Sequence, residues 1–444
     1  MEARKGPSTA MACEMCAGFA GTYVLKILLN RGGVIAAPHG IHFDAYRNKL
    51  VKTWRPGGNN HPLQRLGLSI ARKRVMGGGE KAAPPAPRQR PVERILDLAR
   101  WAPSGDNEQP WRFEIVSDTA VVIHGHDTRD WCVYDLDGTS SQIAIGALLE
   151  TMAIAASGEG MRIQWTLRPD SPDNAPTMDV FLVPDETVAE HPLLPYITQR
   201  VTQRKPFDTR ALVPAQKAQL EASVGEGYRV VWVEGQRRRA MAKLLFHNAH
   251  IRLTTPEAFE VHKQNIEWGV QFSEDRLPEG ALGLDAPTRK VMRFALGSWG
   301  RVKFLNRFFA GTWLPRLQMD WRTGLGCAAH FLIVADRPLV SAEDYFHAGA
   351  AMQRFWLQAS ALGLQFQPEM TPVIFSRYVA DGLPFTSVAS EQALAQRLAG
   401  MLNGVLGDEH DPHQRVYMGR VGFGDTPTSR SVRPPLEKLL LQPD

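Results

Sequence analysis

The sequence predicts an α+β protein, and three observations support this class. Apolar residues recur at helical spacing in several stretches, first between Val92 and Ala99. Short strand-like runs bounded by turn residues follow these stretches. In addition, two long apolar helices share a pattern of small residues at an offset of 203 positions, from Gly146 to Gly349. Together these features predict helices packed around short antiparallel sheets, arranged as two similar halves.

Residues 1–75 are predicted to be a basic N-terminal extension. Residues 1–90 carry 15 Lys and Arg against 4 Asp and Glu, a net charge of +11, whereas the rest of the chain carries 36 against 42. An apolar helix is expected at about residues 9–30, and we expect it to be buried. One such helix offers too little core for an independent domain. Residues 76–91, rich in Gly and then in Pro, are typical of a linker.

Composition limits the partners and the compartment of the protein. The basic N-terminal segment predicts contact with another protein, and it lacks a recognition motif for nucleic acid, so nucleic acid is disfavoured. Four cysteines in 444 residues do not form a disulfide scaffold, and they suit a reducing cytoplasm. No stretch reaches the roughly 18–20 uninterrupted apolar residues of a membrane span. We therefore expect a cytoplasmic protein without a membrane partner.

The first half is predicted to span residues 92–190. Its first helix ends near Pro103, where turn-forming residues begin. Strands are expected at 112–116 and 120–124, and a strongly apolar helix at 141–157. A second strand pair is expected at 161–167 and 178–183.

The second half, residues 191–444, is predicted to repeat this plan around the helix that contains Gly349. Helices that are apolar on most sides lie in a core or at a dimer interface. An offset this large indicates two copies of one domain. The second copy would carry an insertion at about residues 255–320, where Trp and Phe are mixed with basic residues. This insertion is either a helical extension with its own small core or a lid over a site.

The string Ala-Pro-Ser-Gly-Asp-Asn-Glu-Gln-Pro-Trp, residues 102–111, is the most specific motif. A helix ends, a loop turns, and a strand begins at Trp111. The loop offers backbone N–H groups, a hydroxyl and two side-chain amides, which suit a polar planar ligand. The alternative is a simple helix stop and turn, because these residues are all turn formers.

Two arginine-containing strings could bind an anion. In an extended segment Arg200, Thr202 and Arg204 point to one face, so two guanidinium groups and a hydroxyl converge. Such a group suits a phosphate, because arginine makes bidentate charged hydrogen bonds to planar arrays of oxygens. Near the C-terminus, residues 429–433 add Arg430 and Arg433 beside two serines. Each string could instead be a solvated basic stretch.

Together the three strings resemble the FMN-dependent nitroreductase family. In that family an Arg-x-Ser/Thr-x-Arg/Lys element and a C-terminal Ser/Arg-rich segment hold the FMN phosphate, and a Pro-Ser loop reaches across from the partner subunit. Here the loop occurs only in the first half, and the arginine element begins the second half. The chain is therefore similar to tandem members in which one chain forms an internal pseudo-dimer, so that a monomer suffices. The resemblance covers residues 91–440.

The resemblance implies roles for individual residues. The resemblance implies that the arginine strings bind the phosphate and ribityl end of FMN and that the loop of the first half faces the flavin ring. Gln109 is expected to be structural, and Trp111 to pack in the core. The turn at Gln367 and Glu369 falls where the family runs past the N5 edge of the flavin, although a plain surface turn is an alternative. The implied cofactor-binding residues are Pro103, Ser104, Gly105, Asn107, Arg200, Thr202, Arg204, Gln367, Glu369, Arg430 and Arg433.

The predicted function is that of an FMN oxidoreductase with NAD(P)H as its reductant and an unidentified small organic acceptor. No acid–base residue is singled out by the sequence. The alternatives are a protein that sequesters or senses FMN and a flavin-dependent tailoring enzyme of a biosynthetic pathway. No metal is expected, because Cys13 and Cys16 lack the second pair that a zinc site needs. Residues 6–11 and 25–29 faintly resemble the end of an adenylating ThiF-like domain.

Overall fold

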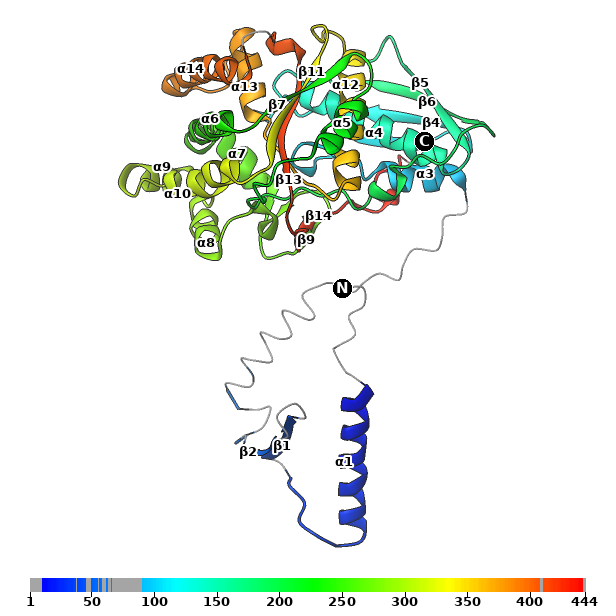
Figure 1. Cartoon of the computed structure of the whole chain (residues 1–444), viewed down its shortest axis with the longest axis vertical. Helices are drawn as coiled ribbons and strands as arrows, with labels where there is room; N and C mark the ends of the chain where they lie inside the picture. Colours follow the sequence, from blue (N-terminus) through cyan, green and yellow to red (C-terminus); the bar gives the residue numbers. More distant parts are fainter. Residues whose placement is uncertain are drawn as a thin grey trace. The chain divides into compact units, whose positions relative to one another are not determined.

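The computed structural model describes residues 10–36, 38–44, 49–54, 56–57, 61–62, 65, 90–407 and 410–441. The chain divides into two compact units, Met1–Pro87 and Arg88–Asp444, and each unit is considered by itself (Figure 1). The predicted linker at 76–91 lies outside the described residues, apart from residues 90 and 91.

The described residues of unit 1 include a helix and a hairpin. Helix α1 spans Ala10–Leu28, and β1 (His39–Asp44) pairs antiparallel with β2 (Lys49–Trp54). The prediction of a buried helix is wrong within this unit, because Ile27 and Leu28 are 63% and 74% exposed. Among the described residues of this unit, the two-stranded hairpin offers too little surface to cover an apolar helix.

Unit 2 begins with a helix and a four-stranded sheet that form the first half. Helix α3 (Pro91–Ala99) precedes β3 (Trp111–Ile115) and β4 (Ala120–Gly125), and α4 (Thr139–Ser157) precedes β5 (Met161–Leu167) and β6 (Thr177–Pro184). The sheet order is β3-β4-β6-β5, with every neighbouring pair antiparallel. The predicted strands and the long apolar helix lie within two residues of their observed bounds, because the periodicity of apolar residues is strong here. The first helix ends at Ala99, four residues before the predicted end near Pro103.

The second half repeats this topology. Helix α5 (Pro214–Ser223) precedes β7 (Tyr228–Val233), and α12 (Ala342–Ala361) lies between β11 (Ala329–Ala335) and β12 (Gln365–Pro368), which is followed by β13 (Arg415–Gly422). The sheet order, β7-β11-β13-β12, is that of the first sheet when the strands are matched in chain order. All its pairs are antiparallel. The α+β prediction, with antiparallel sheets packed with helices, is confirmed.

Helices α4 and α12 pack against each other with an internal two-fold relation. A Cβ on Gly146 would lie 2.0 Å from the backbone oxygen of Phe346, and a Cβ on Gly349 would lie 2.1 Å from that of Ile143. The offset that relates Gly146 to Gly349 also relates Ile143 to Phe346. Each contact is therefore the image of the other, as in the isologous interface of a symmetric dimer.

Polar pairs along the same two helices follow the same rule. Arg354 donates to Glu150 at 2.8 Å, and Gln353 donates to Thr151 at 2.9 Å. The offset relates Glu150 to Gln353 and Thr151 to Arg354, so each of the two pairs is the image of the other. Helix α4 is also the only helix among the described residues that is long and apolar enough to cross a membrane, but 83% of it is buried inside unit 2. It is therefore the core helix of the pseudo-dimer.

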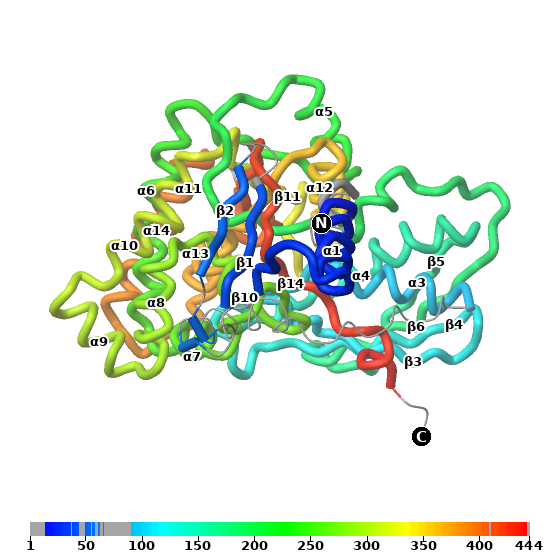
Figure 2. The backbone as a smooth tube through the Cα atoms, turned by 90° about the horizontal axis from the view of Figure 1, so that it is seen from below, coloured from blue at the N-terminus to red at the C-terminus, as the bar shows by residue number. Residues whose placement is uncertain are grey.

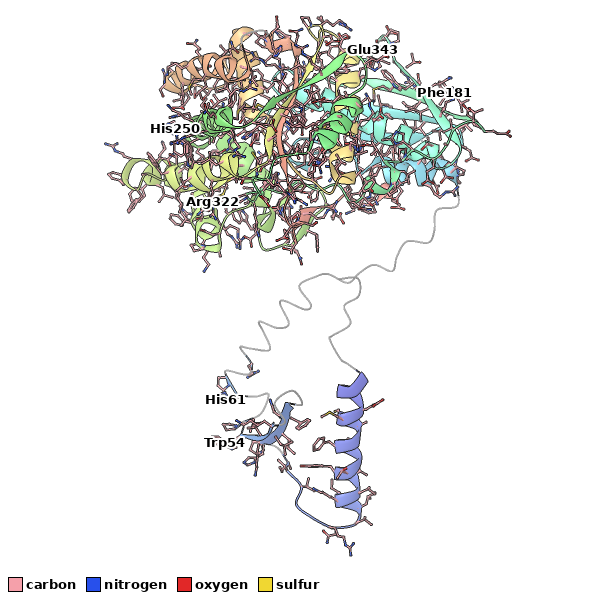
Figure 3. The ribbon with its side chains drawn as sticks, viewed as in Figure 1. Trp54, His61, Phe181, His250, Arg322 and Glu343 are labelled. Atoms are coloured by element: carbon pink, nitrogen blue, oxygen red, sulfur yellow. The ribbon has the colours of Figure 1, made fainter. Side chains whose placement is uncertain are left out.

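Two insertions distinguish the second half from the first. Where β3 and β4 are joined by residues 116–119, β7 and β11 are joined by residues 234–328, which is longer than the 255–320 that the sequence predicted. This first insertion lies on the side of unit 2 away from the first sheet, as α6, α8, α9 and α10 show (Figures 1 and 2). His250 and Phe181, labelled in Figure 3, mark the two sides. A second insertion, which the sequence analysis missed, joins β12 to β13. The elements of the insertions are α6 (Gln236–Thr254), α7 (Pro256–Asn265), β8 (Ile266–Glu267), β9 (Phe272–Ser273), β10 (Leu277–Pro278), α8 (Ala286–Ala295), α9 (Trp299–Phe308), α10 (Trp313–Arg316), α11 (Arg322–Leu325), α13 (Thr371–Ala380) and α14 (Ala389–Leu406).

The end of each half crosses to the other half. Thr202, which follows the first half, forms a parallel bridge with Phe366 of β12. The C-terminal segment returns to β3, where Phe113 donates to the carbonyl of Leu439 at 2.9 Å and Leu441 donates to that of Phe113 at 2.8 Å. These crossings bring all three motifs singled out in the sequence to the junction between the halves.

Candidate functional site

A cavity of about 570 Å³ lies in unit 2, within the range of ligand sites in proteins. Its walls come from the Pro-Ser loop, the segment 200–204, β12 and β14 (Arg430–Ser431), together with the first insertion. Ten of the eleven predicted site residues line it. The eleventh, Glu369, does not line it.

The Pro-Ser loop has an unusual backbone. Asp106, Asn107 and Gln109 have φ angles of 46°, 73° and 54°, a region that non-glycine residues seldom occupy. The Ser104 hydroxyl accepts a hydrogen bond from the backbone N–H of Gln109 at 2.9 Å, which closes the loop. Such strain persists only where the surroundings impose it, and it is concentrated at functional sites. The loop thus holds Ser104 and the residues after it in one fixed backbone conformation.

The Asn107 side chain holds three segments of the chain together. Its Nδ2 donates to the carbonyls of Glu274 at 2.9 Å and of Val432 at 3.2 Å, and its Oδ1 accepts from Arg433. Gln109 donates to the same Glu274 carbonyl at 2.9 Å, which makes it structural as predicted. The amide of Asn107 is thus bound by protein groups, and its role is to hold the loop in place.

Four arginines, Arg200, Arg204, Arg430 and Arg433, line one end of the cavity. Among the described residues, no carboxylate lies within ion-pair distance of any of them. Burial lowers the pKa of all four guanidinium groups, that of Arg200 to about 9. Buried cations are normally paired, so this cluster is electrostatically complete only with an anion.

The four guanidinium groups differ in what they already bind. Arg433 donates to the Ala102 carbonyl at 2.7 Å as well as to Asn107, so it mainly holds the loop. Arg200 donates to the Trp101 carbonyl at 2.8 Å, and Arg204 to that of Ala281 at 3.3 Å. Arg430 donates to the backbone carbonyl of Arg200 at 3.1 Å. Arg200, Arg204 and Arg430 therefore retain N–H groups for an anion.

The turn after β12 departs from the prediction at Glu369. Its side chain lies in a buried cluster, where Oε2 is 2.6 Å from Nδ1 of His330 and Oε1 is 3.6 Å from Nε of Arg420. A buried carboxylate needs cationic partners, and these lie away from the cavity. For this reason the Glu369 side chain lies in the buried cluster and does not line the cavity, unlike the other ten predicted residues. Gln367 does line the cavity, and its Oε1 accepts from Nε of Arg420 at 3.2 Å. Its amide N–H groups thus remain to face the cavity.

The His330–Glu369 pair predicts a pH dependence of stability. Burial alone would lower the pKa of His330, but the Glu369 carboxylate outweighs it and raises the pKa from 6.5 to about 10. Nε2 of His330 is also 2.8 Å from the Gly324 carbonyl, so both ring nitrogens donate. Stabilisation from this pair is complete below pH 6.5 and is lost as the pH rises towards 10.

We therefore expect the melting temperature of the wild-type protein to fall between these pH values. The Glu369→Gln variant should melt lower at pH 6.5 and should show a shallower fall. Parallel curves for the two proteins would contradict the pairing.

Several cavity residues were not found by the sequence analysis. Tyr134 and His262 line it with the Tyr134 hydroxyl 3.1 Å from Nε2 of His262, and burial lowers the pKa of His262 to about 3. Arg252 donates to Asp320 at 2.6 Å in the same wall. The two members of each pair come from distant parts of the chain, so no local pattern joins them. Outside the cavity, the sequence analysis also missed Arg420, the partner of Glu369, although a charge inside the apolar strand β13 was a signal for it.

A second cavity, of about 560 Å³, is the internal counterpart of the first. Five residues of α4 and α12 that line it are related by the offset of the repeat to residues of these helices that line the first cavity. It contains Arg337 and Arg354, which pair with Asp344 and Glu150, so it offers no unpaired cation cluster. The five matched pairs are Ser141 and Asp344, Ile143 and Phe346, Ala144 and His347, Leu149 and Met352, and Ala153 and Trp356.

Comparisons with known proteins give structural matches alone. No protein-family model and no curated protein sequence matches the chain. Among solved structures, it is similar to a nitroreductase-like family protein from Bacillus cereus, with 12% identity, a TM-score of 0.29, and coverage of 57% of this chain and 97% of the other. It is also similar to an FMN and NADPH-dependent nitroreductase NfnB from a Sphigopyxis strain. Here the identity is 16% and the TM-score 0.32, with coverage of 57% of this chain and 100% of the other.

A third solved structure is the FMN-dependent nitroreductase NfnB from Mycobacterium smegmatis in complex with NADPH. Its identity is 17% and its TM-score is 0.31, with coverage of 56% of this chain and 96% of the other. Identities and TM-scores this low establish similarity alone.

Proposed function

We propose that the protein is an FMN-dependent oxidoreductase of the nitroreductase type, with one flavin site at the junction of its two halves. The observation that carries this proposal is the cluster of arginines that have no carboxylate partner, at one end of a cavity large enough for a cofactor. A phosphate supplies the missing anion, and guanidinium groups bind it through charge-assisted hydrogen bonds. When bound, FMN supplies hydride or two-electron transfer at its N5 atom.

The chain's own residues have distinct tasks in this site. Arg200, Arg204 and Arg430 hold the phosphate, and Thr202 contacts the ribityl end. Arg433 and Asn107 keep the Pro-Ser loop in position rather than touching the cofactor. Of the two C-terminal arginines, Arg430 thus binds the phosphate, whereas Arg433 supports the loop.

The other walls of the cavity orient the ring system. Ser104 keeps its O–H free to donate, because its oxygen accepts from Gln109. A Cβ on Gly105 would meet nothing within 4 Å, so the backbone there leaves room for a planar ligand. Gln367 offers amide N–H groups, oriented by Arg420. NAD(P)H is the proposed reductant, and a small organic molecule is the proposed acceptor.

The visible absorption spectrum of the purified protein tests this function. We expect a flavin band that saturates at one FMN per chain, because the second cavity has no unpaired arginine cluster. Under anaerobic conditions, NADPH or NADH should bleach the band, and an acceptor should restore it. If the protein shows no flavin band after incubation with excess FMN, the proposal is contradicted. A band that neither NADPH nor NADH bleaches would favour a protein that sequesters FMN.

A further inference from the structure

The first insertion presents an unusual surface at α8, α9 and α10, here called the α8–α10 face and defined as residues 286–316. Among the described residues of unit 2, 15 large hydrophobic side chains are exposed, and seven of them lie on this face. Scattered exposed hydrophobics are normal, whereas a cluster of this kind marks an interaction site. The seven are Val291, Phe294, Phe304, Phe308, Phe309, Trp313 and Leu314.

The charge of this face has a single sign. Residues 286–316 contain seven Lys and Arg and no Asp or Glu. The cations lie beside the exposed rings, because the Arg301 guanidinium is 4.6 Å from the Phe294 ring centre and that of Arg307 is 5.6 Å from Phe308. A partner of this face must therefore present negative charges close to an apolar region into which the rings can insert. Arg316 is buried and donates to the Phe246 carbonyl at 2.8 Å, so the surface itself carries six of the seven. These six are Arg289, Lys290, Arg293, Arg301, Lys303 and Arg307.

Closure of the cavity does not explain these side chains. Val291, Phe309 and Leu314 line the cavity, but Phe304 and Phe308 do not, and Phe308 is 64% exposed. Phe304 packs on Phe308 with ring centres 5.2 Å apart, which forms an aromatic tip on α9. Figure 1 shows α9 and α10 at the edge of unit 2, away from both sheets.

We propose that the α8–α10 face docks on an anionic phospholipid surface. Basic helices with Phe, Trp and Leu on one side bind membranes by placing the apolar groups at the acyl boundary and the cations among the headgroups. Charge complementarity selects anionic lipid, and the exposed aromatic tip supplies the apolar insertion. No membrane-spanning segment is needed for this mode of binding.

Docking in this way gives the cavity a specific supply of substrate. Val291, Phe309 and Leu314 are each at least half exposed and also line the cavity, so its wall and the membrane-facing surface are continuous. The inner wall formed by α8, α9 and the turn between them is mostly apolar, with Met292, Leu296 and Val302 among its residues. The acceptors are therefore apolar molecules held in the lipid phase. This second step rests on the proposed function, whereas the docking itself does not.

Sedimentation of the full-length, flavin-loaded protein with lipid vesicles tests the docking. We expect binding to vesicles of phosphatidylcholine mixed with phosphatidylglycerol, and none to phosphatidylcholine alone. Replacing Lys303 and Arg307 by Gln should lower the binding constant about 30-fold, at the strength usual for Lys and Arg near an anionic surface. Phe308→Ser should remove the part of the binding that resists added salt.

The matched control is the double variant Arg239→Gln with Arg397→Gln, which makes the same charge change at exposed positions on α6 and α14. It should bind vesicles like the wild type. Equal weakening by both double variants, or no binding to any vesicle, would overturn the proposal. Binding to polyglutamate without binding to vesicles would assign the face to an acidic protein and would also overturn it.

The substrate step has its own measurement. With a long-chain quinone dissolved in the anionic vesicles, replacing Lys303 and Arg307 by Gln should lower kcat/KM more than it does with a water-soluble quinone. Equal effects on the two quinones would reject membrane supply of the substrate while leaving the docking intact. Because flavin content is read by absorbance and docking by sedimentation, failure of the proposed function is recognised separately.

Discussion

Replacing Arg204 by methionine is expected to weaken FMN binding while raising the melting temperature of the flavin-free protein. The guanidinium lines the anion end of the cavity, has no carboxylate partner, and donates only to the Ala281 carbonyl at 3.3 Å. Charge-assisted hydrogen bonds contribute about 1.5–3 kcal/mol each, so the dissociation constant should rise roughly 10- to 150-fold. Removing an unpaired, poorly solvated cation stabilises the empty fold, and methionine keeps much of the volume.

Misfolding would not produce this combination of weaker FMN binding and a higher melting temperature. A damaged protein would lose flavin and stability together. Arg204→Lys keeps the charge but loses the fork of donors, so its affinity for FMN should lie between those of the wild type and Arg204→Met. Arg210→Met, at an exposed position further along the same segment where the guanidinium is 3.8 Å from the Phe423 ring centre, should leave FMN affinity unchanged. Unchanged FMN affinity in Arg204→Met, measured by flavin fluorescence titration, would remove the phosphate role.

The sequence predicted most of the site because its parts are local strings. The Pro-Ser loop and the Arg-x-Thr-x-Arg segment are continuous strings, and the structure brings both to one cavity. Their division of labour could not be predicted, because it depends on contacts between distant segments. Arg433 binds the loop at Asn107, far away in the sequence, and only the folded chain shows that this occupies its donors.

Glu369 and the second insertion show two further limits of sequence reasoning. The family pattern placed Glu369 beside the cofactor, whereas the partners that decide its position, His330 and Arg420, come from other strands. The helices α13 and α14 have an ordinary amphipathic pattern, so nothing distinguished them from elements of the repeated plan. The exposed α1 was misjudged because apolar composition was taken as burial, although burial requires a surface to pack against.

The repeat, by contrast, was visible because it rests on glycines with a physical task. On helices α4 and α12 the two backbones approach so closely that only hydrogen fits between them. Gly146 and Gly349 therefore mark the crossing point, and their spacing gives the offset of the whole repeat. Small residues elsewhere in these helices are interchangeable, so they carry less information.

Replacing Gly146 by alanine is expected to destabilise the protein severely. The added Cβ would lie 2.0 Å from the Phe346 oxygen, which is backbone and cannot move aside without shifting α12. Overpacking of a core commonly costs about 1–3 kcal/mol, and a clash with backbone lies at or above that range, so we expect a loss of about 3 kcal/mol or more in the free energy of unfolding.

The same substitution at Gly400, inside α14, is the matched control, because its Cβ would meet nothing within 4 Å. There alanine should stabilise the helix by roughly 0.5–1 kcal/mol, through its higher helix propensity. Urea denaturation of the two variants should thus give changes of opposite sign from one chemical change. Since both halves build the cavity, Gly146→Ala should also lose FMN binding before it unfolds completely. Equal stability of Gly146→Ala and wild type would mean that the two halves do not meet at this helix crossing, and the single site at their junction would lose its foundation.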